Sequence, residues 1–360
     1  MDLLVTLKKG KITTGMTLQP LVRSKRVNRI YVVRDRPGAK LPKVKYYCLP
    51  KMLTKSGVIK TIAKLVLMMY LTVIKNPQAI LSFQSFPHGF NAFICGKIFR
   101  KPINVNIMGS PRNWRGRRKL IPLLRRFNAI SVTGAKSRDY LIKEGFDADK
   151  VYILPDAIDM ERFRPIPVTK KYDVVTVTRL SPEKNLEVLL RAVAMVKKNK
   201  GDLKVGILGN GSTKDSLELL SRRLDIENNI EFIGFKQNTD FYYNSSRLYV
   251  LTSTTEGLPM ALLEAMACGL PCIVSNVGDI SDAAIDGFNA IVVDNPNDVN
   301  AFANAITKLL EDDVLRRTFS HNALKVRQDY CYERATEVWE RIFDSLSLSK
   351  EETPNENTCG

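Results

Sequence analysis

The feature that most constrains the fold is an alternation, across residues 172–293, of short apolar runs with longer helical patterns. Each run is nearly continuous in apolar residues, as in a parallel sheet that is covered on both faces. Strands that alternate with helices predict a doubly wound α/β domain, in which ligands bind beyond the carboxyl ends of the strands. The predicted strands are 172–180, 203–209, 229–235, 247–253, 271–276 and 289–293, and the predicted helices are 185–198, 213–224, 259–269 and 299–312.

The first half of the chain shows a weaker form of the same alternation and predicts a second Rossmann-like domain. Two prolines interrupt the periodicity near 162–172, so the domain boundary is predicted there. We expect an N-terminal domain at 1–165, a C-terminal domain at 166–330, a helix at 331–348 returning toward the N-terminal domain, and a disordered polar tail at 349–360. The strands predicted in this half are 2–7, 29–34, 79–84, 103–108 and 129–134, and the helices are 58–75, 89–99, 117–126 and 136–144.

Charge is divided unevenly along the chain. Residues 1–150 hold 31 Lys and Arg against six Asp and Glu, whereas residues 151–360 hold 24 against 31. A half so strongly cationic predicts a polyanionic partner, such as a membrane surface, a phosphorylated acceptor or nucleic acid. The six scattered cysteines and the lack of a secretory signal at the N-terminus favour a reducing cytosol.

Residues 178–185, "TRLSPEKN", place two cations at the carboxyl end of a predicted strand. Ser181 suits the N-cap of the next helix and Pro182 its first position. Lys184 then falls in the first turn, where the helix terminus disfavours a cation unless an anion completes the site. With Arg179 and free backbone N–H groups beside it, Lys184 predicts a phosphate-binding site.

A second candidate follows the strand at 247–253. Glu256 stands in a loop, Gly257 lets the backbone approach a ligand, and Pro259 begins a helix that carries Glu264. A third feature, "GNG", places Gly209 and Gly211 after another strand, in a loop without side-chain bulk. Each signal alone is weak, since a glycine pair is more often a turn and two glutamates more often a solvated helix face. Their order along the chain is much more specific.

These motifs resemble the retaining glycosyltransferases of family four, which have the GT-B fold of two Rossmann-like domains facing across a cleft. The resemblance is strong over 150–312 and includes "VTRLSPEKNLEVLLRA", "LGNGS" and "TTEGLPMALLEAMACGLPCIVS". It implies that the C-terminal domain binds a nucleotide-sugar donor. By resemblance, the side chains of Arg179 and Lys184 hold the diphosphate, Glu264 the ribose hydroxyls, and Glu256 lies beside the reacting carbon of the sugar. By the same resemblance, further donor contacts come from Gly15, Gly209, Gly211, Gly257, Leu258, Pro259 and Leu262.

The chemistry agrees with these roles. Cleavage of a sugar–diphosphate bond leaves growing charge on the diphosphate, and fixed cations stabilise that charge without reorganising. A nearby carboxylate favours the oxocarbenium-like carbon. We therefore expect no metal and no other cofactor. The one Asp-x-Asp, Asp147 and Asp149, is interpreted as a surface turn before a strand.

The N-terminal domain is expected to bind the acceptor. Many family members carry a His after the strand that corresponds to 103–108, where this chain has Met108, Gly109 and Ser110. We take Gly109, Ser110 and His88 as acceptor-side candidates. His88 follows a strand, so it would either face the cleft as a base or cap the next helix.

The segment 111–127 has seven Arg and Lys, no acid and one Trp beside several apolar residues, which is typical of an interfacial helix on an anionic membrane. Its predicted membrane contacts are Arg112, Trp114, Arg115, Arg117, Arg118, Lys119, Arg125 and Arg126. The apolar segment 58–75 carries three lysines and is interpreted as too short and too charged to span, hence as a buried helix of the sheet domain.

The sequence therefore predicts a metal-independent retaining glycosyltransferase, with a UDP-sugar favoured as donor on family frequency. We expect a lipid-linked glycan acceptor in surface polysaccharide or glycoconjugate synthesis, and a cytoplasmic enzyme peripheral on the inner face of the membrane. The alternatives are a soluble glucan synthase or a sugar-nucleotide epimerase of the same fold and, remotely, a nucleic-acid-binding protein. Sparse aromatics and the absence of a known nucleic-acid motif disfavour this last alternative.

Overall fold

The computed structural model describes the chain except for residues 8–9, 55, 110, 112–119, 202 and 349–360. Its contacts divide the residues into two units. Unit 1 contains Met1–Ala157 together with the chain from Tyr332 onward, and unit 2 is the continuous stretch Ile158–Cys331. The prolines that were expected to mark the boundary thus lie inside unit 2.

The sheet of unit 1 has seven parallel strands in the order β3-β2-β1-β4-β5-β6-β7. Near-continuous apolar runs form its centre, as expected for strands that are buried on both faces. Strand β3 was not predicted, because its lysine and tyrosines break the apolar run at the edge of the sheet. The strands are β1 (Asp2–Leu7), β2 (Arg29–Arg34), β3 (Val44–Cys48), β4 (Ala79–Phe83), β5 (Ile103–Ile107), β6 (Ala129–Val132) and β7 (Val151–Ile153).

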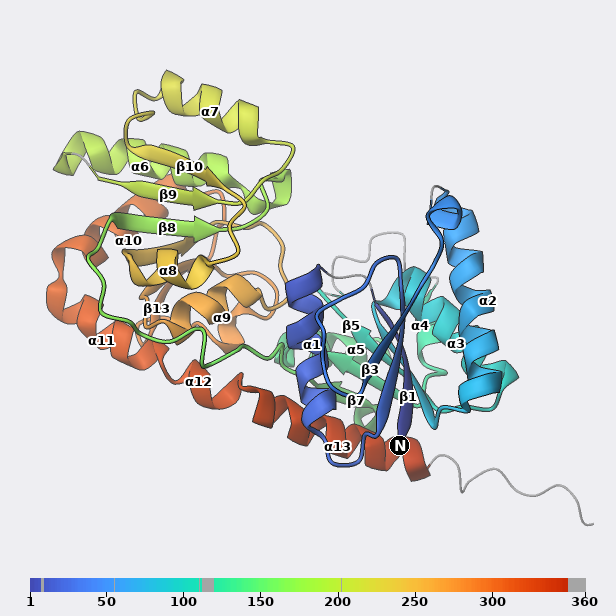
Figure 1. Cartoon of the computed structure of the whole chain (residues 1–360). Coiled ribbons are helices and arrows are strands. Elements are labelled where there is room, and N and C mark those ends of the chain that lie inside the picture. The colour runs from blue at the N-terminus through green and yellow to red at the C-terminus, as the bar shows by residue number, and fades with distance from the viewer. Residues whose placement is uncertain (8–9, 55, 110, 112–119, 202, 349–360) are drawn as a thin grey trace, which may run out of the picture. The chain divides into compact units, whose positions relative to one another are not determined.

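Helices cover this sheet, and the last one comes from the far end of the sequence (Figure 1). Helix α13 packs beside α1, and its Trp339, Ile342 and Phe343 are buried in one core with β1, β2 and β4. The helices of unit 1 are α1 (Lys11–Arg23), α2 (Gly57–Lys75), α3 (Phe90–Ile98), α4 (Ile121–Leu124), α5 (Ala135–Lys143) and α13 (Tyr332–Leu348).

Helix α2 differs from its prediction in two respects. It is long and apolar enough to cross a membrane by length and composition, so the expectation that it is too short and too charged is wrong. Nor is it an ordinary buried helix, since much of its apolar surface is exposed. Figure 1 shows it at the outside of unit 1, beside α3.

Unit 2 is a doubly wound domain whose six parallel strands run in the order β10-β9-β8-β11-β12-β13. The strands are β8 (Tyr172–Val177), β9 (Val205–Leu208), β10 (Ile230–Gly234), β11 (Ser246–Leu251), β12 (Cys272–Ser275) and β13 (Ala290–Val293). The helices are α6 (Leu186–Lys200), α7 (Lys214–Arg223), α8 (Thr239–Asn244), α9 (Met260–Ala267), α10 (Val299–Glu311), α11 (Asp313–Ala323) and α12 (Val326–Asp329).

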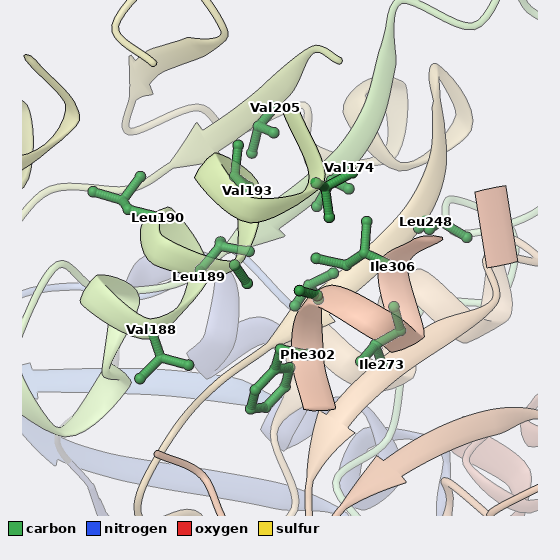
Figure 2. Packing of buried hydrophobic residues seen from close by; sticks show 14 of the residues in the cluster. Val174, Val188, Leu189, Leu190, Val193, Val205, Leu248, Ile273, Phe302 and Ile306 are labelled. Atoms are coloured by element: carbon green, nitrogen blue, oxygen red, sulfur yellow. The ribbon is translucent and has the colours of Figure 1, made fainter. Parts of the chain in front are cut away.

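The core of unit 2 is formed where α6 and α10 lie against the sheet (Figure 2). Leu189 and Val193 of α6 and Phe302 of α10 are buried against strand residues such as Val174 and Ile273. This packing fixes the strand ends, and the loops that follow β8 and β11 carry the predicted site residues.

Candidate functional site

Lys184 and Glu256 form an ion pair between the loops that follow β8 and β11. The Lys184 Nζ lies 2.6 Å from the Glu256 Oε1, and the two side chains are only 14% and 10% exposed. The Ser253 hydroxyl donates to the same oxygen at 2.7 Å. Two donors therefore hold this carboxylate in place. The anion beside Lys184 in this structure is thus a side chain of the protein, and the contact of Lys184 with a phosphate stays a prediction.

The loop around Lys184 does not have the predicted helical form. Pro182–Lys184 is a single 3₁₀ turn, and Asn185 then adopts a left-handed conformation with φ of 53° before α6 begins at Leu186. Lys184 thus precedes α6 instead of lying in its first turn. The unfavourable helix dipole that motivated the phosphate prediction is not the reason for its position.

Arg179 lies near Lys184 in sequence but in a different environment. Its side chain is 71% exposed, and its Nη2 lies 3.6 Å from the Glu183 Oε1. The Ser181 hydroxyl, predicted to cap a helix, instead donates to Glu183 at 2.7 Å. This hydrogen bond, then a backbone hydrogen bond and, to a smaller extent, the charge of Arg179 lower the pKa of the Glu183 carboxyl. Arg179 is therefore accessible to an anionic ligand, whereas Lys184 is already partnered.

The glycines of the "GNG" loop serve the packing of the chain. A Cβ on Gly209 would lie 1.8 Å from the Thr178 carbonyl oxygen, and one on Gly211 would lie 1.9 Å from that of Leu180. The Leu180 N–H also donates to the Asn210 carbonyl at 3.0 Å. The two glycines thus let this loop approach the loop that carries Arg179, and their expected contact with the donor stays a prediction.

Gly278 allows a similarly close packing against the loop that carries Glu256. This glycine was not identified from the sequence. It has a φ of +60°, and a Cβ there would lie 2.2 Å from the Glu256 carbonyl oxygen. The next residue, Asp279, donates its N–H to the Gly257 carbonyl at 3.0 Å. The available signal was a glycine soon after a strand, at the same edge of the sheet as Gly209.

Helix α9 begins as predicted, with Pro259 at its N-cap. The side chains of Leu258 and Leu262 are buried in the core, so only their backbone groups could meet a ligand. The Leu262 N–H donates to the Pro259 carbonyl at 3.1 Å, and its expected contact with the donor stays a prediction. The N–H groups of Met260 and Ala261 lie in the first turn, where a helix supplies no acceptor of its own.

Glu264 points to a tyrosine from a neighbouring helix. The Tyr243 hydroxyl on α8 donates to the Glu264 Oε2 at 3.0 Å. Burial raises the pKa of Glu264 to about 7 and raises that of Tyr243 as well. The predicted contact of Glu264 with ribose remains a prediction, and Tyr243 is a partner that sequence reasoning missed.

The candidates of unit 1 are placed differently from expectation. Gly15, expected by resemblance to contact the donor, lies within α1, where a Cβ would approach the Ala39 Cβ to 3.1 Å. Gly109 has a φ of +83° with open space around the Cβ position. The neighbouring candidate Ser110 lies outside the described residues.

His88 is buried at the carboxyl end of β1. Its side chain is 2% exposed, and its Nδ1 lies 2.7 Å from the Thr6 hydroxyl. The following helix α3 has Gly89 at its N-cap and no side-chain capping bond, so the capping alternative is wrong. The role of acceptor base stays a prediction, for a group that is covered in this structure.

The predicted membrane segment 111–127 is corrected in part. Arg112, Trp114, Arg115, Arg117, Arg118 and Lys119 lie outside the described residues. The apolar side chains of Ile121, Leu124 and Phe127 are buried in the core of unit 1 and do not form an outward face.

The two described arginines of that segment lie over aromatic rings of unit 1 itself. Arg125 lies over the Phe146 ring and Arg126 over the Phe93 ring, at 5.7 and 5.6 Å from the centroids. Both remain exposed, so their predicted contact with a membrane stays a prediction.

The described part of the chain holds no group of three or more His, Cys, Asp or Glu side chains that could bind a metal ion. Asp147 and Asp149 form the expected turn, since the Asp149 N–H donates to the Asp147 carboxylate at 3.0 Å. A short 3₁₀ helix at Ala148–Lys150 then leads into β7.

Residues 158–326 match the model of a family described as glycosyl transferases group 1. An uncharacterized glycosyltransferase of Haemophilus influenzae is 26% identical over 64% of this chain and 67% of that protein. The UDP-Gal:alpha-D-GlcNAc-diphosphoundecaprenol alpha-1,3-galactosyltransferase of Escherichia coli is 28% identical over 50% of each. An N-acetylgalactosamine-N,N'-diacetylbacillosaminyl-diphospho-undecaprenol 4-alpha-N-acetylgalactosaminyltransferase of Campylobacter jejuni is 32% identical over 48% of each. The chain spans about half the length of these last two relatives.

Solved structures share the fold. HepE of Anabaena in complex with UDP has a TM-score of 0.79 at 19% identity, over 97% of this chain and 100% of that one. TarM of Staphylococcus aureus, in a complex that includes UDP, has a TM-score of 0.68 at 21% identity, over 78% and 59%. With two parallel-sheet Rossmann-like units, this likeness confirms the predicted GT-B fold.

Proposed function

We propose that the chain is a member of the glycosyl transferases group 1, whose model matches residues 158–326. In this proposal it is a retaining transferase that moves a sugar from a nucleoside diphosphate sugar, UDP-sugar favoured, to a lipid-linked glycan. The reaction contributes to surface polysaccharide or glycoconjugate synthesis. Relatives named for undecaprenyl-diphosphate acceptors support the acceptor class, and structural neighbours in complex with UDP support the donor.

The observation that carries the proposal is the Lys184–Glu256 pair at the carboxyl ends of β8 and β11. An ammonium group has three N–H donors, and the Glu256 carboxylate uses one of them. The remaining donors of Lys184 are available to a diphosphate, and exposed Arg179 supplies a fork beside it. Fixed positive charge of this kind stabilises the departing diphosphate.

Glu256 has two roles in this scheme. Its carboxylate holds Lys184 in place through a short charged hydrogen bond. Its negative charge also favours the positive character that develops on the anomeric carbon as the bond to the diphosphate breaks. The acceptor hydroxyl then forms the new bond, and its proton leaves with the diphosphate. We propose that no divalent metal is needed, because protein cations perform the neutralisation.

We further propose that the enzyme works at the inner face of the cytoplasmic membrane. The excess of cations in residues 1–150 suits an anionic membrane surface that carries the acceptor. Nucleic acid is not a partner in this scheme.

The test is a donor panel of UDP-, GDP- and ADP-sugars, assayed by nucleotide release with a membrane lipid extract as acceptor. Lys184→Ala or Glu256→Ala should lower turnover by about 10³-fold or more while the circular dichroism spectrum stays unchanged. Lys214→Ala, which removes an exposed lysine of α7, is the matched control and should leave turnover unchanged. Wild-type rates in either site variant would remove that residue from the mechanism.

Two further results would overturn parts of the proposal. Loss of activity in EDTA that is restored by a divalent cation would contradict metal independence. Conversion of the donor to an epimer, without incorporation of labelled sugar into the lipid extract, would replace transfer by epimerisation.

A further inference from the structure

Helix α2 turns an apolar face outward. Seven of its large side chains are each more than half exposed, on a helix that contains no Asp or Glu. The preceding turn, Lys51–Thr54, adds Met52, which is 82% exposed. The exposed apolar residues of α2, here called the α2 outer face, are Val58, Ile59, Ile62, Val66, Tyr70, Val73 and Ile74.

The inner side of α2 buries two polar side chains beside the apolar Met68 and Leu71. Lys64 is 4% exposed, and its Nζ lies 2.6 Å from the Asp35 carboxylate. Thr72 is also buried and donates its hydroxyl to the Met68 carbonyl at 2.8 Å. A surface helix of a globular domain turns its charged and polar residues outward, whereas the outer side of α2 is apolar. The polarity of α2 is therefore that of a helix whose outer side meets an apolar medium.

That medium can touch only one side of the helix. The inner side of α2 packs on α3 and on strands β1 and β2, and it holds the Lys64–Asp35 ion pair. A helix anchored to a folded sheet in this way lies along a membrane surface with one face inserted, and it does not cross the bilayer. Its length and apolar composition, which would suffice for a span, serve the inserted face instead.

The charge next to the α2 outer face identifies the partner. A groove at the carboxyl-terminal end of α2 is lined by four cations and two tyrosines, with no acid among its lining residues. These residues are Arg29, Lys43, Lys45, Lys75, Tyr31 and Tyr47, together with Val44. An apolar face beside a cationic groove is complementary to a bilayer with anionic headgroups.

A second copy of the chain fits this surface less well. The first 150 residues carry 31 cations against six acids, so two copies paired through α2 would bring like charges together. An anionic bilayer offers acyl chains in its interior for the apolar face and negative headgroups at its surface for the cationic groove. The observations thus favour lipid over self-association.

We propose that α2 is the interfacial helix of this protein: its outer face inserts among the acyl chains of an anionic membrane, and the Arg29/Lys43/Lys45/Lys75 groove holds lipid phosphates. This surface lies in unit 1, and the inference does not depend on the proposed transferase activity. It deepens the proposed membrane partner by placing the contact on α2 and away from the buried apolar residues of 120–127.

The test uses the full chain and sedimentation with vesicles of phosphatidylcholine, with and without phosphatidylglycerol. The double variant Ile62→Gln/Val66→Gln should bind the anionic vesicles at least tenfold more weakly than wild type. The control Leu219→Gln/Val314→Gln changes two exposed apolar residues of unit 2 and should bind like wild type. Equal binding by the α2 variant and wild type would overturn the inference.

A second variant tests the groove. Lys45→Gln/Lys75→Gln should lose the preference for anionic over neutral vesicles while keeping the weaker apolar binding. A preference that survives this change would remove the groove from the proposal. Sedimentation equilibrium without lipid tests whether a second copy of the chain occupies the α2 outer face. If wild type is a dimer and the Ile62→Gln/Val66→Gln variant is a monomer, the face belongs to a second copy and the inference is overturned.

Failure here and failure of the proposed function can be told apart. UDP binding, measured by calorimetry without lipid, reports on unit 2 and should be the same in the α2 variant and wild type. Vesicle binding without nucleotide binding would leave the α2 inference standing and remove the transferase. Nucleotide binding without vesicle binding would overturn the α2 inference and leave the proposed transferase standing.

Discussion

Helix α2 of unit 1 and helix α6 of unit 2 both flank a parallel sheet but turn different kinds of side chain outward. Both combine Val, Ile or Leu with Lys. In α6 the leucines and valines are buried, and cations such as Arg191 and Lys198 face out. In α2 a lysine is buried, and valines and isoleucines face out. The contrast shows that the sequence of a helix makes it amphipathic, but that the groups packed against the helix determine which of its faces is buried.

The strongest test of this contrast compares two truncations. Leu189→Ala in α6 should lower the free energy of unfolding of unit 2 by about 3–5 kcal/mol, because Leu189 is fully buried. Ile62→Ala in α2 removes a similar side chain from an exposed position and should change stability by less than about 0.5 kcal/mol.

The two units can be followed separately in urea. Both tryptophans, at positions 114 and 339, belong to unit 1, so their fluorescence reports its unfolding, while circular dichroism reports both units. Leu189→Ala should shift the dichroism transition and leave the fluorescence transition in place. A large fluorescence shift in Ile62→Ala would show that the α2 outer face is covered within the protein.

A smaller effect is expected from the buried charge of α2. Lys64→Met should destabilise unit 1 by about 2–4 kcal/mol, because the Asp35 carboxylate loses its 2.6 Å partner. Lys60 lies 3.6 Å from the same carboxylate, is more exposed, and contributes less. Lys60→Met is therefore the control, with an expected loss under about 1 kcal/mol. Equal losses in the two variants would contradict the special role of Lys64.

The smallest effect concerns Glu264 of unit 2. This acid faces the uncharged hydroxyl of Tyr243, whereas Lys64 of unit 1 faces the charged carboxylate of Asp35. In the folded protein, burial raises the pKa of Glu264 to about 7, above the usual glutamate value of 4.5. The folded state therefore holds a proton that the unfolded chain releases. Stability is highest below pH 4.5 as far as this group is concerned, and it falls as the pH rises toward 7.

Glu264→Gln, which keeps a polar partner for Tyr243 without the titration, should remove this pH dependence. The difference in unfolding free energy between wild type and the variant should change by roughly 2 kcal/mol between pH 5 and pH 8. Parallel stability curves over that range would show that Glu264 titrates normally.

Much of the fold follows from the sequence, and the exceptions have physical causes. Strands β1 and β2 match their predicted bounds because they are nearly continuous apolar runs. Strand β3 was missed because an edge strand keeps its polar residues. Helix α1 was not predicted because Gly15, Pro20 and several threonines lower its helix propensity, and packing overrides them.

The site shows the same limit. The order of Arg179, Lys184 and Glu256 along the chain was enough to single them out. The pairing of Lys184 with Glu256 was not predictable, because the two residues are 72 positions apart and meet only when β8 and β11 are neighbours. The burial of Lys64 depended in the same way on Asp35, which lies 29 residues earlier at the end of β2.

The return of α13 to unit 1 has a consequence for biosynthesis. Residues that complete the core around Trp339 leave the ribosome only after all of unit 2, which is one uninterrupted stretch that precedes them. The later-encoded half can therefore finish folding while the earlier one still waits, with its α1 side uncovered. A nonsense mutation shortly before Tyr332 would spare the second half and leave the first incomplete.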